Sequence, residues 1–312
     1  MVRSTLILLI ASFAAAAGAA YVYEGGWGSA GSGNGEFNNP TGLALSPNRN
    51  LYVADYHNDR VQYFTSAGSF LGKWDSYSAH GLTFGPNGRV YVTQYFGYRV
   101  QCFTAAGSLL YQWGSRGAGP GQFEFPRGVS CAANGRVYVA DAGNHRVQYF
   151  TAAGVYEGQW GRSGTGQGEF NFPSGVGVSP SGRVYVAEYF GQRIQYFTAN
   201  GSFLGSWGSR GGGPGEFYNP LFLAFGPDGT VFVDDSANDR VQYFTPTGSF
   251  LGSFGGTGSG PGQISLATGV AVWPTGARVY VGDFRNQRIQ YFNRNEPAVT
   301  PASWGTIKAL YR

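Results

Sequence analysis

Charged residues, histidine, methionine and cysteine are scarce in this chain of 312 residues. Only 12% of the residues are charged, and there are three histidines, two cysteines and one methionine, against 52 glycines, 21 tyrosines and 24 phenylalanines. Few charges together with many aromatic residues argue against a disordered chain, which needs low hydrophobicity and high net charge. Nothing after residue 20 has the pattern of a long amphipathic helix. Glycine with aromatic and β-branched residues favours short strands and tight turns, so the predicted class is all-β.

The scarcity of cysteine and histidine also limits the chemistry. Cys102 and Cys131 each replace a hydrophobic residue at a strand position, so two buried thiols are favoured, although a disulfide remains open. His57, His80 and His145 are scattered, whereas a catalytic zinc site usually has three protein ligands. The sequence has no Gly-x-Ser-x-Gly motif, which would mark a nucleophilic serine, and nothing in it singles out the pair of carboxylates that a glycosidase needs. We therefore expect no metal, no cofactor and no enzyme activity.

Long apolar runs are absent except at the start. Arg3 precedes the apolar stretch Leu6 to Ala17, and small residues follow. This layout predicts a signal peptide over residues 1–20, cleaved near Ala19/Ala20. The alternative, a membrane anchor, would need roughly 20 apolar residues, so we expect a mature chain without a membrane span. The predicted location is extracellular, or periplasmic or at the cell surface in a bacterium.

The net charge is small. It is +4 for the whole chain and +3 without Arg3, and the basic residues are spread evenly. Nucleic-acid-binding proteins usually cluster Lys and Arg on a strongly basic surface, so we do not expect a nucleic-acid partner.

What the sequence does have is an internal repeat. Arg-(Val/Ile)-Gln-(Tyr/Cys)-Phe occurs six times at spacings of 39, 47, 47, 47 and 48 residues, beginning at Arg60, Arg99, Arg146, Arg193, Arg240 and Arg288. An acid or its amide stands five residues earlier, at Asp55, Gln94, Asp141, Glu188, Asp235 and Asp283. A carboxylate this close to an arginine can order a tight loop through a charge-assisted hydrogen bond, so these pairs are predicted to be structural.

Each repeat divides into four strands. In the fourth, Gly175 to Val178, Arg183 to Ala187, Arg193 to Phe197 and Ser202 to Trp207 are separated by turn sequences such as Ala-Asn-Gly. Four strands in about 47 residues are typical of a propeller blade. The prediction is a six-bladed β-propeller of four-stranded antiparallel blades over residues 21–305, followed by a tail over 306–312.

The consensus Pro-x-Gly-Val-x-Val-x-Pro-x-Gly-x-Val-Tyr-Val-Ala-Asp-x-x-Asn-x-Arg-Val-Gln-x-Phe resembles the NHL repeat. It is clearest at Pro40 to Phe64 and Pro126 to Phe150, and the resemblance covers residues 21 to about 305. It implies the same six-bladed propeller. The second repeat is about eight residues short because it lacks a glycine-rich loop, which predicts a notch in the rim.

Two segments could complete the sixth blade. Tyr21–Trp27 copies the outermost-strand pattern of Val155 to Trp160, and Ala298–Trp304 could fill the same place. We favour the N-terminal segment.

Departures from the repeat mark the candidate sites. The position at the start of the innermost strand is predicted to form a ring at the channel mouth, where Leu221 and Thr268 join the candidates Thr41, His80, Arg127 and Ser174. His80 and Arg127 come from neighbouring repeats and suggest an anion or carboxylate site, although polar residues that only solvate the channel are the simpler interpretation.

The loop between the second and third strands supplies a second set. Repeats two and four carry Tyr-Phe-Gly where others carry small residues, and such loops should open on one face. Aromatic side chains with Asn and Arg suit contacts with a protein, peptide or glycan, although packing against the glycine-rich loops is the alternative. The candidates are Tyr56, His57, Tyr95, Phe96, Tyr98, Tyr189, Phe190, Phe284 and Arg285.

The predicted function is that of an exported, monomeric binding scaffold that uses the loops of one face. The resemblance leaves two alternatives: a metal-dependent lyase or lactonase, as among secreted six-bladed propellers, and an RNA-binding or ubiquitin-ligase-associated domain. The last is usually joined to RING, B-box or coiled-coil segments, for which this chain has no room.

Overall fold

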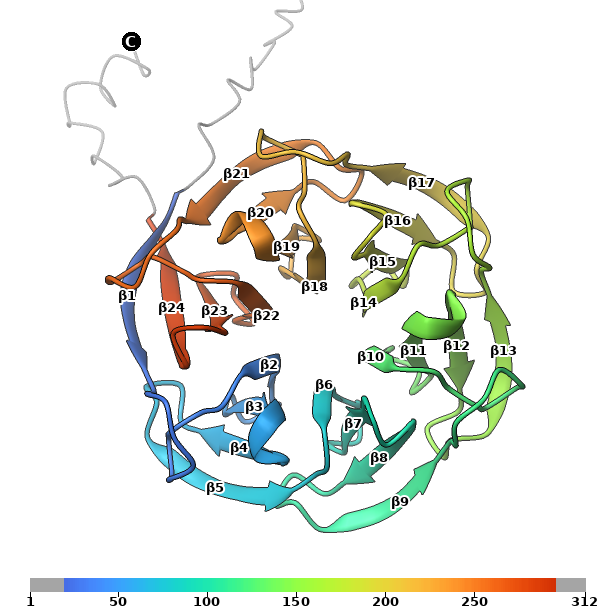
Figure 1. The fold of residues 1–312 in the computed structure, drawn as a ribbon, viewed down its shortest axis with the longest axis horizontal. Helices are drawn as coiled ribbons and strands as arrows, with labels where there is room; N and C mark the ends of the chain where they lie inside the picture. The colour runs from blue at the N-terminus through green and yellow to red at the C-terminus, as the bar shows by residue number, and fades with distance from the viewer. Residues whose placement is uncertain (1–19, 296–312) are drawn as a thin grey trace, which may run out of the picture.

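The computed structural model describes residues 20–295. Within this range the strands form six four-stranded antiparallel sheets arranged as a ring (Figure 1). The innermost strands of all six sheets line a central channel. The predicted all-β class and six-bladed propeller are confirmed. Residues 1–19 of the predicted signal peptide, the alternative closing segment Ala298–Trp304 and the tail 306–312 lie outside the described residues, so their assignments stay predictions.

The four strands of each blade occupy equivalent positions from the channel outward. The innermost strands are β2 (Pro40–Leu45), β6 (Ala79–Phe84), β10 (Pro126–Cys131), β14 (Pro173–Val178), β18 (Pro220–Phe225) and β22 (Ala267–Val272). The second strands are β3 (Leu51–Asp55), β7 (Val90–Gln94), β11 (Val137–Asp141), β15 (Val184–Glu188), β19 (Val231–Asp235) and β23 (Arg278–Asp283).

The two outer positions follow the same order around the ring. The third strands are β4 (Arg60–Phe64), β8 (Arg99–Phe103), β12 (Arg146–Phe150), β16 (Arg193–Phe197), β20 (Arg240–Phe244) and β24 (Arg288–Arg294). The outermost strands are β5 (Phe70–Asp75), β9 (Leu109–Trp113), β13 (Tyr156–Trp160), β17 (Phe203–Trp207), β21 (Phe250–Gly255) and β1 (Tyr21–Trp27). Three short 3₁₀ turns, η1 (Tyr56–Asn58), η2 (Ala142–Asn144) and η3 (Ser236–Asn238), join second to third strands. No helix in residues 20–295 is long and apolar enough to cross a bilayer.

The hydrophobic core lies between neighbouring blades. The second strands are buried on both faces, which explains their unbroken apolar composition. In one cluster, Tyr52 and Trp74 of the first blade pack against Val92 and Phe103 of the second. Blade-to-blade packing of this kind holds the loops of all six blades on a fixed frame.

The ring is closed by the N-terminal strand. β1 pairs antiparallel with β24 and completes the sheet β22-β23-β24, as we expected from its pattern. Buried Tyr21 packs 5.4 Å, between ring centroids, from Phe232, Tyr243 and Phe254 of the fifth blade. Its hydroxyl donates to the Gly276 carbonyl oxygen at 2.8 Å. The first and last described strands are thus fixed in one blade.

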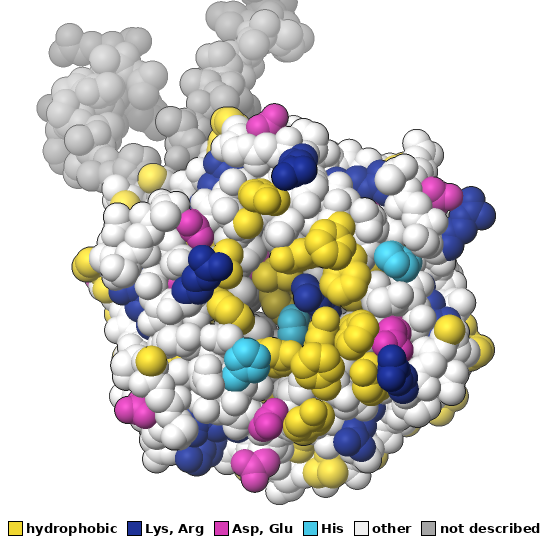
Figure 2. All heavy atoms as spheres, in the orientation of Figure 1, with side chains coloured by type: hydrophobic (Ala, Val, Ile, Leu, Met, Phe, Trp, Pro, Cys, Tyr) yellow, Lys and Arg dark blue, Asp and Glu magenta, His cyan; other side chains and the backbone are white. Residues whose placement is uncertain are grey.

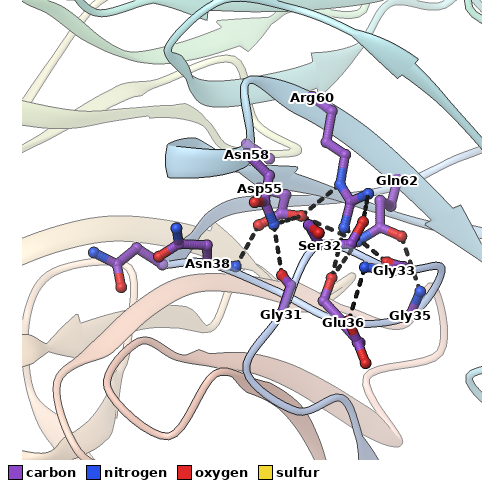
Figure 3. A network of polar contacts seen from close by, with 12 residues as sticks. Gly31, Ser32, Gly33, Gly35, Glu36, Asn38, Asp55, Asn58, Arg60 and Gln62 are labelled. Atoms are coloured by element: carbon purple, nitrogen blue, oxygen red, sulfur yellow. Dashed lines mark hydrogen bonds and ion pairs between the residues drawn. The ribbon is translucent and has the colours of Figure 1, made fainter.

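The repeated acid and arginine hold a glycine-rich loop over five of the six blades, and Figure 3 shows the network of the first blade. In the first blade, the buried Asp55 carboxylate accepts from Arg60 Nε at 2.7 Å and Gln62 Nε2 at 3.2 Å. The Arg60 Nη atoms donate to the carbonyl oxygens of Ser32, Gly33 and Glu36 at 2.6 to 2.9 Å. Ion pairs of the same kind join Asp141–Arg146, Glu188–Arg193, Asp235–Arg240 and Asp283–Arg288. The pairs therefore have the structural role predicted for them.

The second blade lacks this loop. β5 ends at Asp75 and β6 begins at Ala79, so three residues connect them, whereas residues 114–125 connect β9 to β10. The acid is replaced by Gln94, whose Oε1 accepts from Arg99 Nε at 2.7 Å. In the neighbouring core, Cys102 and Cys131 are both free thiols, so the disulfide that the sequence left open is not formed.

Candidate functional site

A cavity of about 370 Å³ opens at the mouth of the channel, on the face that carries the loops between second and third strands. Figure 2 shows hydrophobic side chains gathered around this central hollow, with a basic side chain and a histidine inside it. The lining is Thr41, Tyr56, His80, Tyr95, Phe96, Arg127, Tyr189, Asn219, Leu221, Phe222, Ser236, Ala237, Leu266, Thr268 and Phe284. The cavity is thus largely aromatic and apolar, with a few polar groups that converge on it, as is usual for small-molecule sites.

Arg127 is the second residue of β10, the third blade's innermost strand, and extends into a cage of aromatic rings. Its guanidinium carbon lies 4.8 Å from the ring centroid of Phe172, 5.2 Å from that of Tyr189 and 5.4 Å from that of Tyr95. No carboxylate in the described part of the chain lies within ion-pair distance of it, and its buried Nε has no hydrogen-bond partner. The aromatic faces stabilise the cation, and its Nη atoms, which form no hydrogen bond within the described residues, are the donors left for an anionic ligand.

His80 is the second residue of β6, the innermost strand of the neighbouring second blade. It is buried, and its ring stacks on Tyr95 at 5.4 Å between centroids, with an interplanar angle of 26°. Burial, and then the charge of Arg127, hold the pKa of His80 well below its ordinary value, so the ring is neutral near pH 7. Its Nδ1 is buried without a hydrogen-bond partner. A neutral imidazole can donate a hydrogen bond through one ring nitrogen and accept one, or a proton, through the other, and here it lies beside an unpaired guanidinium.

Phe222 closes part of the channel from the opposite side. It stands in β18 where the other innermost strands carry Gly42, Gly81, Gly128, Gly175 and Gly269. Its ring centroid lies 5.5 Å from that of His80. Asp234, which replaces an alanine, glycine or threonine of the other blades, accepts from the backbone N–H groups of Leu221 and Phe222. In the fifth blade, two neighbouring residues, Phe222 and Asp234, thus differ from the other repeats, and together they place an aromatic ring against the histidine.

Eight of the residues predicted from the sequence line this one cavity. They are Thr41, Tyr56, His80, Tyr95, Phe96, Arg127, Tyr189 and Phe284. The expected ring of innermost-strand residues and the aromatic loops, treated as two sets in the sequence, meet here because the loops of the second and fourth blades fold over the mouth.

The structure places five predicted residues outside the cavity. The Ser174 hydroxyl instead donates to the carbonyl oxygens of Ala187, Pro220 and Leu221 at 3.0 to 3.2 Å. Exposed His57 contacts the Asn39 side chain at 2.9 Å. The other three project from loops without lining the cavity, and they are Tyr98 (beneath Arg116), Phe190 (55% exposed) and Arg285.

Sequence reasoning missed several aromatic and polar members of the site. Phe172 and its counterpart Phe125, which stacks on Tyr95 at 5.0 Å, stand just before the innermost strand. Equivalent positions hold Asn39, Ser78, Asn219 and Leu266, all with φ between 50° and 61°. Comparing the six repeats at the residue just before each innermost strand, as was done for the positions at the strand start, would have identified Phe125 and Phe172. Phe222 carried an equally clear signal, as one phenylalanine among five glycines.

Metal ligands do not gather at the cavity. Its lining contains one imidazole and no carboxylate, and no group of three His, Cys, Asp or Glu side chains within residues 20–295 could hold an ion. The residues described here therefore do not fit the zinc or calcium site of the metal-dependent alternatives, and we derive no step through a metal.

The NHL repeat family model matches residues 37–64 and 123–150. A comparison with curated protein sequences found no match. Among solved structures, the chain is similar to virginiamycin B lyase from Staphylococcus aureus in a catalytically inactive form with quinupristin, at 14% identity and a TM-score of 0.61, covering 88% of this chain and 98% of that one. It is similar to a gluconolactonase from Xanthomonas campestris at 15% identity and a TM-score of 0.64, with the same coverage. A Bacteroides thetaiotaomicron protein of unknown function has a TM-score of 0.68 at 13% identity, over 88% and 76% of the two chains.

These comparisons correct one expectation. The sequence led us to expect a chain without enzyme activity, but the similar solved structures include two kinds of enzyme, a lyase and a lactonase. At 13 to 15% identity the likeness shows the fold alone. The small number of acids and histidines available for catalysis was therefore not a sufficient reason to predict that the chain has no enzyme activity.

Proposed function

We propose that the channel mouth of this six-bladed β-propeller, two segments of which match the NHL repeat model, binds a small organic anion with a flat or apolar body. The observation that carries the proposal is Arg127, a cation enclosed by Tyr95, Phe172 and Tyr189 without a carboxylate partner. A planar carboxylate matches the guanidinium fork, and the surrounding rings offer stacking faces to the rest of the ligand.

The volume of the cavity limits the size of the ligand. About 370 Å³ is near the lower end of the range for small-molecule sites. The loops led us to expect a protein, peptide or glycan partner. A cavity of this volume admits only the end of such a chain or a free small molecule. The C-terminus of a peptide and an acidic sugar both present the required carboxylate.

A panel of small carboxylic acids, each paired with its neutral amide, tests the proposal. Thermal-shift screening at pH 7 followed by calorimetric titration should find acids that bind and amides that bind at least about tenfold more weakly, the scale of a charge-assisted hydrogen bond. Arg127→Gln should remove the difference, whereas Arg285→Gln, on the same face but outside the cavity, should preserve it. Equal affinity for acids and amides would refute the proposal.

An enzymatic role for the same cavity is a second candidate, favoured by His80. The lowered pKa makes His80 a weak base in the free protein, but a carboxylate bound to Arg127 would offset the positive charge that contributes to this lowering. The neutral imidazole could then take a proton from the carbon next to that carboxylate, and the guanidinium would stabilise the negative charge that develops. Loss of a leaving group from the adjacent carbon would complete an elimination of the lyase class. Solvent deuterium exchange into a bound acid, followed by NMR and lost in His80→Gln, is the measurement that tests this role.

Export of the chain is a further part of the proposed function, supported by the sequence of residues 1–20 alone. Mass determination of the protein recovered outside the cytoplasm should give an N-terminus near Tyr21. An intact Met1 on exported protein would count against cleavage.

A further inference from the structure

The second blade has an arginine that has lost both of its usual partners. In the other five blades this arginine pairs with an acid of its own blade, at 2.6 to 2.8 Å. Its terminal nitrogens also donate to carbonyl oxygens of the covering glycine-rich loop, as Arg146 does to Ala118, Gly119 and Gln122. The five blades thus define what this side chain binds.

Arg99 has neither set of partners. The acid is replaced by Gln94, and the connection from β5 to β6 is about eight residues short, so the loop that would supply the carbonyls is missing. Within residues 20–295, Arg99 forms one hydrogen bond, from Nε to Gln94 Oε1 at 2.7 Å, and no ion pair. Its Nη atoms are not buried, so they remain accessible.

The surrounding polar groups are satisfied without the loop. Gln94 Nε2 donates to Gln101 Oε1 at 2.8 Å, and Gln101 Nε2 donates to Gln112 Oε1 at 3.0 Å. Ser76 Oγ donates to Gln101 Oε1 at 3.2 Å. We call this group, Ser76, Gln94, Arg99, Gln101 and Gln112, the blade-two notch. The amides of Gln94 and Gln101 are engaged in these contacts, so the positive charge belongs to Arg99, whose Nη atoms and the exposed Gln112 Nε2 are the donors left without a partner in the notch.

We propose that the blade-two notch is a second binding site, separate from the channel mouth, that takes a carboxylate on the Nη atoms of Arg99. A carboxylate restores both losses at once, because it supplies the missing negative charge and two oxygens in place of the missing carbonyls. A neutral ligand would restore only the second.

The covering loop of the third blade supplies a probe. Residues 117–122, Gly-Ala-Gly-Pro-Gly-Gln, present three carbonyls to Arg146, the last from Gln122 at 2.8 Å. The N-acetylated hexapeptide with a free C-terminal carboxylate, its C-terminal amide and N-acetylglycine would be titrated into the full protein. Binding is followed through the Arg99 Nε–H NMR signal and by calorimetry.

The acid hexapeptide should bind about tenfold or more tightly than its amide. Gln94→Asp should reduce the affinity by a similar factor, because the new carboxylate would pair with Arg99 as Asp55 pairs with Arg60. Arg99→Gln should do the same, with circular dichroism confirming its fold. Arg162→Gln, an exposed arginine of another loop, is the matched control and should leave binding unchanged.

Two results separate the source of the carboxylate. Comparable binding of N-acetylglycine and the acid hexapeptide assigns the notch to small carboxylates, and binding of the hexapeptide alone assigns it to peptides. The proposal is overturned if neither acid moves the Arg99 signal at millimolar concentration, if the amide binds as well as the acid, or if Gln94→Asp has no effect. None of these outcomes bears on the channel mouth, which Arg127→Gln tests separately.

Discussion

Three ionisable side chains near the channel mouth have pKa values shifted toward their neutral forms. Burial lowers the pKa of His80, and burial raises the pKa values of Asp234 and Tyr56. Because each of these shifts favours the uncharged side chain, the positive charge of Arg127 is left uncompensated. The proposed selectivity for anions therefore depends on this one residue and on the neutrality of its neighbours.

His80 should make the stability of the protein depend on pH. The unfolded histidine binds a proton as the pH falls through about 6.5, whereas the folded one resists it, so the wild-type protein loses stability on acidification. In His80→Gln the decrease in the free energy of unfolding between pH 7.5 and 5.0 should be smaller. Urea denaturation at both pH values measures this, with exposed His57→Gln expected to behave as wild type. Identical pH profiles for His80→Gln and wild type would contradict the assignment.

Asp234 should have the opposite dependence. Its pKa is raised by burial well above the ordinary 3.8, so the folded state keeps a proton that the unfolded state releases as the pH rises. The free energy of unfolding contributed by this group therefore falls above about pH 4. Asp234→Asn should gain stability relative to wild type between pH 4 and 7, as measured by urea denaturation. A difference that stays constant over this range would show that Asp234 ionises normally.

The polar network beneath the glycine-rich loop differs between blades, because it contains an acid–arginine ion pair in five blades and a glutamine in place of the acid in the second. Asp141→Ala would leave buried Arg146 without its partner, and we expect a loss of about 3–5 kcal/mol. Gln94→Ala, at the equivalent position of the second blade, removes neutral hydrogen bonds and should cost about 1–3 kcal/mol. Chemical denaturation of both variants gives the comparison. Equal losses would mean that the ion pair contributes no more than the amide.

Strand positions were largely predictable because the repeat fixes them. Arg193–Phe197 agrees with the predicted third strand, and the second strand differs by one residue at each end, at Val184–Glu188. The innermost strand begins at Pro173 rather than Gly175, because a register shift lets Pro173 pair with Glu188. Such irregularities depend on the partner strand and leave no mark in the repeat itself.

The site was predictable only in part. The departures at His80 and Arg127 were visible in sequence, but their joint enclosure by Tyr95 required the blades to be placed side by side. The departure at Phe222 was visible as well, but its contact with His80 crosses the channel from the opposite blade and could not be read from the repeat. Comparison within the repeat shows which residue departs, whereas only the ring shows which departures meet.

At the scale of the whole molecule, closure depends on a strand from the N-terminal end. A chain beginning at Gly28 would lack β1, expose the edge of β24 and remove buried Tyr21 from the fifth blade. We expect a loss of about 3 kcal/mol or more and a tendency to self-associate, compared with a chain beginning at Ala20. Thermal unfolding and sedimentation velocity measure the two effects. A chain from Gly28 with unchanged Tm would contradict closure by β1.

Recognition of an anion by Arg127 at the channel mouth can be seen in a crystal structure with the tightest-binding carboxylic acid. We expect the carboxylate in hydrogen-bond contact with the Arg127 guanidinium and the body of the ligand against the aromatic rings of the lining. A ligand bound away from Arg127, or one that turns its neutral end toward the guanidinium, would contradict it.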